Sequence, residues 1–300
     1  MGLLTDRAAL DGPRTLRELL ARKEPTLAPG AFDALSARIV EAAGFDAVYM
    51  TGFGSSASLL GQPDVGLLTE TEMMDNARRM AQAIGVPLIA DADTGYGNPL
   101  NVIRTVREYE RAGVAALHIE DQISPKKCGH MDRKHVIPAR EMAAKIRAAA
   151  DARSDGGILI IARTDARAME GLEGALDRAE RYRDAGADIL FVEAPQGMDE
   201  IEAVARRFGD TPLLFNWAEG GKTPPVALND LASLGFKLVI FPISLLLAAT
   251  QAMRAAAAKI REDGSPINLV ASLPTFQQFT ELVGLPEVKT IENRYGVEEW

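Results

Sequence analysis

Short runs of apolar and β-branched residues recur along the chain. Each is followed by a loop and then by an Ala-, Glu- and Arg-rich stretch with helical period. The short runs predict eight strands, at Thr26–Gly30, Ala47–Met50, Pro87–Asp93, Ala116–Asp121, Ile158–Thr164, Ile189–Ala194, Pro212–Trp217 and Leu238–Pro242. The stretches between them predict helices, among them Glu72–Ile84, Leu100–Ala112, Ala139–Ala150, Leu172–Ala185 and Asp199–Arg207. Several helical stretches end in glycine, which suits the left-handed residue that closes a helix: Ala43-Gly44, Ala112-Gly113, Ala185-Gly186 and Leu234-Gly235.

Eight strand–helix units without hairpin signals predict a parallel (β/α)8 TIM-type barrel over residues 1–262, with an open doubly wound sheet as the alternative. The barrel is favoured because polar residues gather at or just after the ends of five strands: Asp91, Asp93, Glu120, Asp121, Arg163, Glu193 and Asn216. The pattern stops after about residue 262, and the amphipathic segment Phe276–Leu282 follows. We therefore expect residues 263–300 to form a C-terminal helical arm of the same single domain, packed on the barrel or on a neighbouring subunit.

Composition narrows the class of protein. With 47% hydrophobic and 25% charged residues, the chain is expected to be globular. A net charge of −9 disfavours nucleic acid as a main partner. A single cysteine excludes an internal disulfide and a zinc site built on several thiolates. No signal peptide and no run of about 18 apolar residues is evident, so a cytoplasmic location without a membrane span is expected.

The first candidate site is Asp91-Ala92-Asp93, at the end of the third predicted strand. Residues two apart in a strand point to the same side, and two adjacent carboxylates repel each other unless a cation lies between them. Mg²⁺ prefers such oxygen ligands, and Glu120 on the next strand strengthens this interpretation. The alternative is a pair of loop or helix-capping aspartates. His118 is expected to be a core histidine rather than a metal ligand.

The loop Ser124-Pro125-Lys126-Lys127-Cys128-Gly129-His130 carries the densest chemistry. A thiol among two lysines and a histidine forms thiolate more readily than usual and can transfer a proton. Gly129 permits close backbone approach to a ligand, while Lys126 and His130 can hold carboxylates. The alternative is a surface loop with an incidental cysteine.

Two further segments suit anion binding. Arg163 interrupts an apolar strand and can clamp a substrate carboxylate, or it can form a structural ion pair with Glu120 or Glu193. The segment Tyr49-Met50-Thr51-Gly52-Phe53-Gly54 is predicted as a glycine-containing loop whose backbone N–H groups cradle an anion. It lacks the spacing of a nucleotide-binding motif.

Taken together, these residues resemble the isocitrate lyase/phosphoenolpyruvate mutase superfamily over nearly the whole chain. The resemblance is carried by Asp91-Ala92-Asp93-Thr94-Gly95-Tyr96-Gly97, His118-Ile119-Glu120-Asp121, Lys126-Lys127-Cys128-Gly129-His130, Ala162-Arg163-Thr164-Asp165-Ala166 and Glu219-Gly220-Gly221-Lys222-Thr223-Pro224. The Lys-Lys-Cys-Gly-His segment resembles the signature of the lyase branch, because phosphonate mutases generally lack its cysteine.

The resemblance implies a barrel enzyme that uses Mg²⁺, or Mn²⁺ in its place, and forms a homotetramer in which paired subunits exchange a C-terminal helix. It implies that Asp91 and Asp93 hold the metal, with Glu120 and Asp64 supporting it through waters. Substrate is expected to contact Tyr49, Thr51, Gly52, Phe53, Cys128, Gly129, Arg163 and Asn216, in a pocket that Glu193 orients.

The chemistry implied is carbon–carbon cleavage of a small 2-hydroxy acid. The metal stabilises the developing 2-oxo acid, and Lys126, His130 and Arg163 stabilise charge on the carbanion's carboxylate. Cys128 protonates the carbanion carbon, and Tyr49 is a candidate base for the 2-hydroxyl.

Two apolar residues narrow the expected substrate. Leu247 and Phe276 stand where 2-methylisocitrate lyases have arginines that meet a third carboxylate. An apolar side chain cannot compensate a buried carboxylate, which favours an alkylmalate such as 2,3-dimethylmalate. The remaining alternatives are a 2-methylisocitrate lyase, an oxaloacetate hydrolase, a phosphonate mutase, or a catalytically silent 2-oxo acid binding protein.

Overall fold

The computed structural model describes residues 10–129, 131 and 134–296. Eight parallel strands follow one another around a nearly closed barrel in the order β6-β5-β4-β3-β2-β1-β8-β7. A parallel bridge between Leu190 and Leu213 joins the two ends of this series. The strands are β1 (Thr26–Ala31), β2 (Val48–Met50), β3 (Leu88–Asp91), β4 (Ala116–Glu120), β5 (Leu159–Thr164), β6 (Ile189–Val192), β7 (Leu214–Asn216) and β8 (Leu238–Phe241). The predicted TIM-type barrel is confirmed, and the open doubly wound sheet is not formed.

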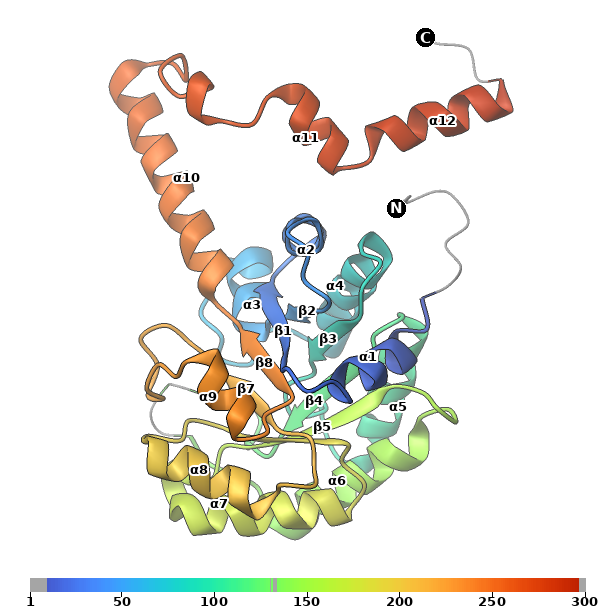
Figure 1. Ribbon diagram of the computed structural model, residues 1–300, viewed down its shortest axis with the longest axis vertical. Coiled ribbons are helices and arrows are strands. Elements are labelled where there is room, and N and C mark those ends of the chain that lie inside the picture. Colours follow the sequence, from blue (N-terminus) through green and yellow to red (C-terminus); the bar gives the residue numbers. More distant parts are fainter. Residues whose placement is uncertain (1–9, 130, 132–133, 297–300) are drawn as a thin grey trace.

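Helices alternate with the strands and surround the barrel (Figure 1). They are α1 (Gly12–Leu20), α2 (Ala34–Ala42), α3 (Gly52–Leu60), α4 (Glu70–Ala83), α5 (Pro99–Arg111), α6 (Ala139–Ala152), α7 (Arg167–Asp184), α8 (Met198–Arg207), α9 (Leu228–Ser233) and α10 (Ser244–Asp263). The glycines expected to close helices, Gly44, Gly113, Gly186 and Gly235, all have positive φ, between 87° and 109°. No helix in the described part of the chain is long and apolar enough to cross a membrane.

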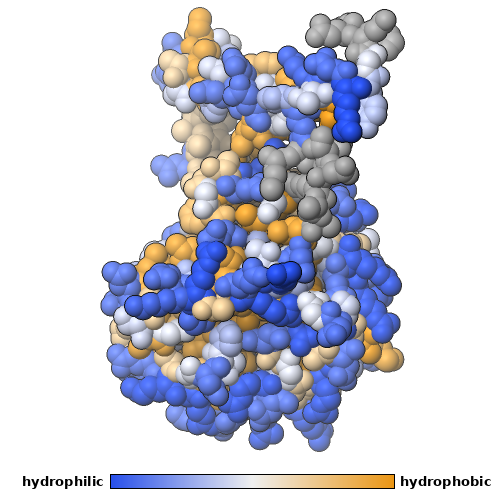
Figure 2. All heavy atoms as spheres, turned by 45° about the vertical axis from the view of Figure 1, so that its right-hand side comes forward, coloured by the Kyte–Doolittle hydropathy of each residue, from blue (hydrophilic) through white to orange (hydrophobic). Residues whose placement is uncertain are grey.

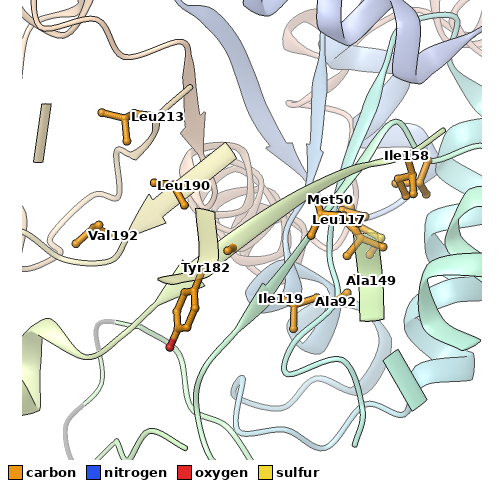
Figure 3. Packing of buried hydrophobic residues seen from close by; sticks show 14 of the residues in the cluster. Met50, Ala92, Leu117, Ile119, Ala149, Ile158, Tyr182, Leu190, Val192 and Leu213 are labelled. Atoms are coloured by element: carbon orange, nitrogen blue, oxygen red, sulfur yellow. The ribbon is translucent and has the colours of Figure 1, made fainter. Parts of the chain in front are cut away.

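The apolar residues form two buried clusters, as expected for a barrel. One lies between strands and helices, where residues such as Met50, Leu117 and Leu190 pack (Figure 3). The other combines strand residues with Leu16, Leu19 and Leu20 of α1. The guanidinium of Arg17 donates to the Gly156 and Gly157 carbonyls just before β5, so α1 covers the end of the barrel where the strands begin. The opposite end, where the strands finish, is left for the site.

A helical arm follows the last strand, as predicted, but it includes α10, which the prediction placed within the barrel at residues 1–262. Helix α10 projects away from the barrel, and a short 3-10 turn (Val270–Ser272), α11 (Phe276–Leu282) and α12 (Leu285–Tyr295) continue beyond it (Figure 1). None of the residues in α10 is buried. The arm touches its own barrel at α2, where Arg38 donates to the carbonyl of Leu282 over 2.9 Å.

Candidate active site

A cavity of about 220 Å³ lies at the ends of the strands. It brings together most of the residues predicted from the sequence, from six of the eight strands and the loops that follow them. The predicted residues that line it are Tyr49, Thr51, Phe53, Asp64, Asp91, Glu120, Lys126, Cys128, Gly129, Arg163, Glu193 and Asn216. Asp93 and Gly52 lie directly beside lining residues, as described below. His130 lies outside the described residues.

The segment predicted as an anion-binding loop after β2 is instead the first turn of α3. Thr51 is the N-cap, and its hydroxyl accepts from the Gly54 N–H over 3.2 Å. A β-carbon on Gly52 would lie 2.3 Å from Oδ2 of Asp91, so only glycine lets this turn pack against that carboxylate. The correction has a local cause: hydroxyl capping by Thr51 supports a helix start in a Gly- and Ser-rich stretch with weak helix propensity.

Asp91 and Asp93 lie together at the end of β3, and both are buried. The Asp93 N–H donates to Oδ1 of Asp91 over 2.8 Å, and Asp93 has a φ of 46°. The ammonium of Lys126 lies 2.8 Å from Oδ1 of Asp93 and 2.6 Å from Oδ1 of Asp64. Lys126 thus bridges two loops and balances a cluster of buried carboxylates, and this arrangement excludes the expectation that the aspartates are simple helix caps.

Burial and charge act in opposite directions on the pKa values of this cluster. Burial alone would lower the pKa of the Lys126 ammonium, but Asp93, Asp91 and Asp64 raise it well above its usual value. Burial raises the pKa of Asp93 to about 7; Lys126 opposes this rise, and Asp91 adds to it. Burial would also raise the pKa of Asp91, but the positive charges of His118 when protonated, Lys126 and Arg163 bring it below the usual value.

The same carboxylates are oxygen donors of the kind that a hard divalent cation prefers. The buried carboxylates of this region belong to Asp64, Asp91, Asp93 and Glu120. Oε1 of Glu120 has no hydrogen-bond partner among the residues that the structure describes. Within residues 10–129, 131 and 134–296, however, no three His, Cys, Asp or Glu side chains surround a single point. The ammonium of Lys126 supplies the compensating positive charge in this arrangement.

Arg163 is the centre of a second charged cluster on β5. Its Nε lies 2.9 Å from Oδ2 of Asp165 and 3.3 Å from Oε2 of Glu120, its register partner on β4. Its Nη2 lies 3.5 Å from Oε2 of Glu193, and its guanidinium stacks 5.0 Å from the ring centre of Phe191. Both structural ion pairs considered for Arg163 are therefore present, and the side chain also lines the cavity.

His118 is a buried core histidine, as expected. Its Nε2 and the Tyr49 hydroxyl are 2.8 Å apart. Burial lowers the pKa of His118 to about 4, so the imidazole is neutral at neutral pH. Burial also raises the pKa of Tyr49 well above its usual value, and Asp91 adds to this rise. The Tyr49 phenol is therefore protonated and can act as a hydrogen-bond donor in the cavity.

The turn that carries Cys128 is fixed to both sides of the cavity. The Cys128 N–H donates to the Asp64 carbonyl over 3.2 Å. Gln122 exchanges two hydrogen bonds with the backbone of Lys127, of 2.8 and 3.0 Å. A β-carbon on Gly129 would lie 2.3 Å from Nη2 of Arg163, so glycine is required for this close approach. Cys128 is partly exposed at the cavity and is not an incidental surface residue.

Glu193 and Asn216 complete the wall formed by β6 and β7. Nδ2 of Asn216 lies 3.2 Å from Oε2 of Glu193, which is buried beside Arg163. This contact orients the amide and leaves its Oδ1 without a hydrogen-bond partner in the described structure. The remaining wall is mostly apolar and includes Phe53, Pro242 and Ile243.

Sequence reasoning missed three polar residues at or beside this site. Glu219 lines the cavity and accepts a hydrogen bond from the Ser244 hydroxyl at the start of α10. Asp165 and Lys134 form a buried pair behind Arg163, 2.7 Å apart. The motif Glu219-Gly220-Gly221 was a signal for the first, whereas Lys134 stands in the polar run Asp132-Arg133-Lys134-His135, which gives no sign of burial.

The two residues used to narrow the substrate do not line this cavity. Leu247 is 46% exposed on α10, and Phe276 is 82% exposed on α11. Both belong to the arm, so neither meets a ligand bound in the cavity of its own chain.

Comparisons with known proteins agree with the fold and identify the family. The family model for phosphoenolpyruvate phosphomutase matches residues 16–261. The chain is 46% identical to the 2,3-dimethylmalate lyase of Eubacterium barkeri, over 94% of this chain and 97% of that protein. It is 45% identical to the chloroplastic carboxyvinyl-carboxyphosphonate phosphorylmutase of Arabidopsis thaliana, over 93% and 83% of the two chains. A solved structure of oxaloacetate acetylhydrolase superposes with a TM-score of 0.92 at 37% identity, covering 97% of this chain and 99% of that one.

Proposed function

Because the chain belongs to the phosphoenolpyruvate mutase/isocitrate lyase superfamily, we propose that it is a carbon–carbon lyase for a 2-hydroxy dicarboxylate of the alkylmalate type. The observation that carries the proposal is the thiol of Cys128 in the same cavity as Arg163 and the carboxylate cluster. Cleavage of a carbon–carbon bond leaves a carbanion that needs a proton, whereas transfer of a phosphorus group does not. A 2,3-dimethylmalate lyase among the relatives supports the same reaction class.

In the proposed reaction Tyr49 accepts the proton of the 2-hydroxyl and passes its own phenolic proton to the neutral His118 imidazole, 2.8 Å away. The 2-hydroxyl oxygen then becomes the carbonyl of a 2-oxo acid. The electron pair of the breaking C2–C3 bond passes to C3, which forms the enolate of the second product. The Cys128 thiol gives its proton to C3, releasing a carboxylic acid and leaving a thiolate. Arg163 and Lys126 place positive charge in the cavity where carboxylate charge develops.

A divalent cation, Mg²⁺ or Mn²⁺ in its place, would be held by Asp91 and Asp93, with Asp64 and Glu120 supporting it. When bound, it would withdraw charge from the 2-oxygen of the substrate. In that state, the ammonium of Lys126 would no longer be needed between Asp64 and Asp93. It would be available to pair with a substrate carboxylate.

The cavity wall supports an alkyl-substituted acid. Part of the wall presents apolar side chains rather than hydrogen-bonding groups to a substrate: those of Phe53, Ile240, Pro242 and Ile243. Burying an alkyl group against them is favourable by about 0.8 kcal/mol for each methylene-sized unit. A third carboxylate on that wall would lack a partner among these residues and would be penalised.

The proposed function predicts a ranking of substrates. Release of 2-oxo acid in the presence of Mg²⁺ should be faster with 2,3-dimethylmalate than with 2-methylisocitrate, isocitrate, oxaloacetate or phosphonopyruvate. Chelation should abolish the activity, and added Mg²⁺ should restore it. Preference for 2-methylisocitrate would overturn the substrate class, and conversion of phosphonopyruvate alone would overturn the lyase.

The arm supports a homotetramer in which the chains exchange C-terminal helices. Figure 2 shows apolar side chains along α10 between the barrel and the rest of the arm. Met253, Phe276 and Phe279 are 63%, 82% and 45% exposed on the arm of a single chain. Apolar surface exposed over a whole arm is typical of a subunit interface. A second copy of the chain is the occupant that we propose.

The arm predicts a measurable change in mass. Light scattering should give four times the chain mass of 32.3 kDa, and Phe276→Glu together with Met253→Glu should lower it to that of a smaller species. Leu100→Glu is the matched control, because Leu100 is 76% exposed on α5 of the barrel. A monomeric wild-type chain would contradict the assembly.

A further inference from the structure

Lys134 is a buried lysine for which the proposed reaction has no use. Lys134 is 5% exposed although it stands in a polar run. Among the residues that the structure describes, its ammonium makes two contacts. One is with Oδ1 of Asp165, 2.7 Å away, and the other is a short hydrogen bond to the Gly129 carbonyl. A buried ammonium must have such partners, because an unpaired charge in the interior is strongly destabilising. The two partners belong to two different parts of the cavity wall.

One partner leads to Arg163. Asp165 is fully buried, and its carboxylate accepts from Nε of Arg163 over 2.9 Å and from Nη2 over 3.1 Å. Burial would raise the pKa of Asp165, but Arg163 and Lys134 bring it below its usual value, so it is ionised. The Asp165 N–H donates to Oδ1 of Asp121, which fixes the backbone at this point. Asp165 is thus a rigid anchor at the end of β5.

The other partner leads to Cys128. Gly129 follows Cys128 directly, and Gly129 packs so closely on Arg163 and Glu193 that a β-carbon would overlap both. The Cys128 N–H holds the turn to Asp64 on the far side of the cavity. On the near side, the Gly129 carbonyl accepts a hydrogen bond from the Lys134 ammonium.

Lys134 itself lies in the loop between β4 and α6, whose two ends pair with each other and form a stem. Gln122 and Val136 form an antiparallel bridge, and the Ile123 N–H donates to the His135 carbonyl over 2.9 Å. The lysine therefore projects inward from a paired stem. Its position is fixed from both ends, by the stem and by Asp165.

We propose that Lys134 is a positioning residue, which fixes the Cys128–Gly129 turn against the Arg163–Asp165 pair. Through it, the thiol and the guanidinium keep a constant spacing across the cavity. The proposal rests on the proposed function only for the consequence on turnover. The effect on the thiol itself follows from the contacts alone.

The experiment compares Lys134→Met with Lys134→Arg in the full chain. Cys128 is the single cysteine, so its alkylation by iodoacetamide reports on this turn alone. We expect Lys134→Met to accelerate alkylation about tenfold, the factor for losing one hydrogen bond to a charged group. It should lower kcat on the preferred substrate by about 100-fold with a much smaller change in KM, as misplacement of a reacting group does. Lys134→Arg keeps both donors and should restore most of each effect.

The matched control is Lys145→Met. Lys145 is 4% exposed on α6, and its ammonium donates to the Thr94 carbonyl over 3.1 Å, away from the Cys128 turn. It should lose stability as Lys134→Met does but keep the wild-type alkylation rate. If Lys134→Met does not fold, Lys134→Gln, which keeps an uncharged N–H donor group, takes its place.

A wild-type alkylation rate in folded Lys134→Met would overturn the proposal, whatever the stability. A wild-type chain without lyase activity would contradict the proposed function instead and would leave the alkylation test intact.

Discussion

Replacing Cys128 with serine is expected to lower kcat for carbon–carbon cleavage by about 1,000-fold, within the range of about 10²–10⁴ that a positioned proton donor contributes. A hydroxyl of nearly the same size occupies the same place, but it is a much weaker acid than a thiol. Because the two side chains make similar contacts, KM and the free energy of unfolding should change little. Turnover of the 2-alkylmalate is measured by the release of 2-oxo acid, and unfolding is measured in urea.

A second measurement isolates the proton transfer. In D₂O, with the 2-oxo acid present, the wild-type enzyme should exchange the hydrogen at C2 of the carboxylic acid product. Cys128→Ser should lose this exchange in proportion to kcat, because the same group moves the proton in both directions. Unchanged cleavage and exchange in the variant would remove Cys128 from the reaction. Loss of cleavage with full exchange would assign the proton to another group.

The barrel could be predicted because each of its strands is indicated by a short local run of residues in the sequence. Runs such as Ile158–Thr164 combine β-branched residues with a following glycine- or alanine-rich helix, and the observed β5 (Leu159–Thr164) differs by one residue. Once eight such runs close into a barrel, the residues at their ends must converge. That is why Asp91, Glu120, Arg163 and Asn216 could be placed together before any contact was known.

What could not be predicted depends on contacts between distant loops. The ammonium of Lys126 between Asp64 and Asp93 joins the α3–α4 loop, the β3 end and the β4–α6 loop. Lys134 reaches Asp165 from a segment that is locally indistinguishable from a solvated surface loop. The start of α3 was missed for a different reason: the glycines of Gly52-Phe53-Gly54 weaken helix propensity, but Thr51 caps the turn.

The direction of the arm also could not be predicted, because it too depends on contacts between distant segments. The helical period of residues 276–282 predicted α11, but nothing in the local pattern fixes where α10 points. Its direction places Leu247 and Phe276 outside the cavity of their own chain. The argument for a substrate with two carboxylates therefore depends on the apolar wall of Phe53, Pro242 and Ile243 rather than on the arm.

The largest expected effect on stability is that of Arg163→Met. Arg163 is 7% exposed and lies within 3.5 Å of carboxylates from Glu120, Asp165 and Glu193. Removing one partner of a buried ion pair leaves uncompensated charge, which costs about 3–5 kcal/mol. We expect a loss of this size in the free energy of unfolding measured in urea. Arg163→Lys should be intermediate, because an ammonium cannot reproduce the fork that meets Asp165 through both Nε and Nη2.

Arg207→Met is the control that separates burial from charge. Arg207 also contacts two carboxylates, Glu180 at 2.7 Å and Asp177 at 3.3 Å, but these pairs lie on the surface of α7 and α8. Exposed ion pairs are screened by solvent and contribute little, so this variant should unfold almost as the wild type does. Equal losses in the two variants would mean that Arg163 contributes no more than a surface pair. A large loss confined to Arg163 would instead identify it as the residue that holds β4, β5 and β6 together at the site, and activity should then fall with stability in Arg163→Met.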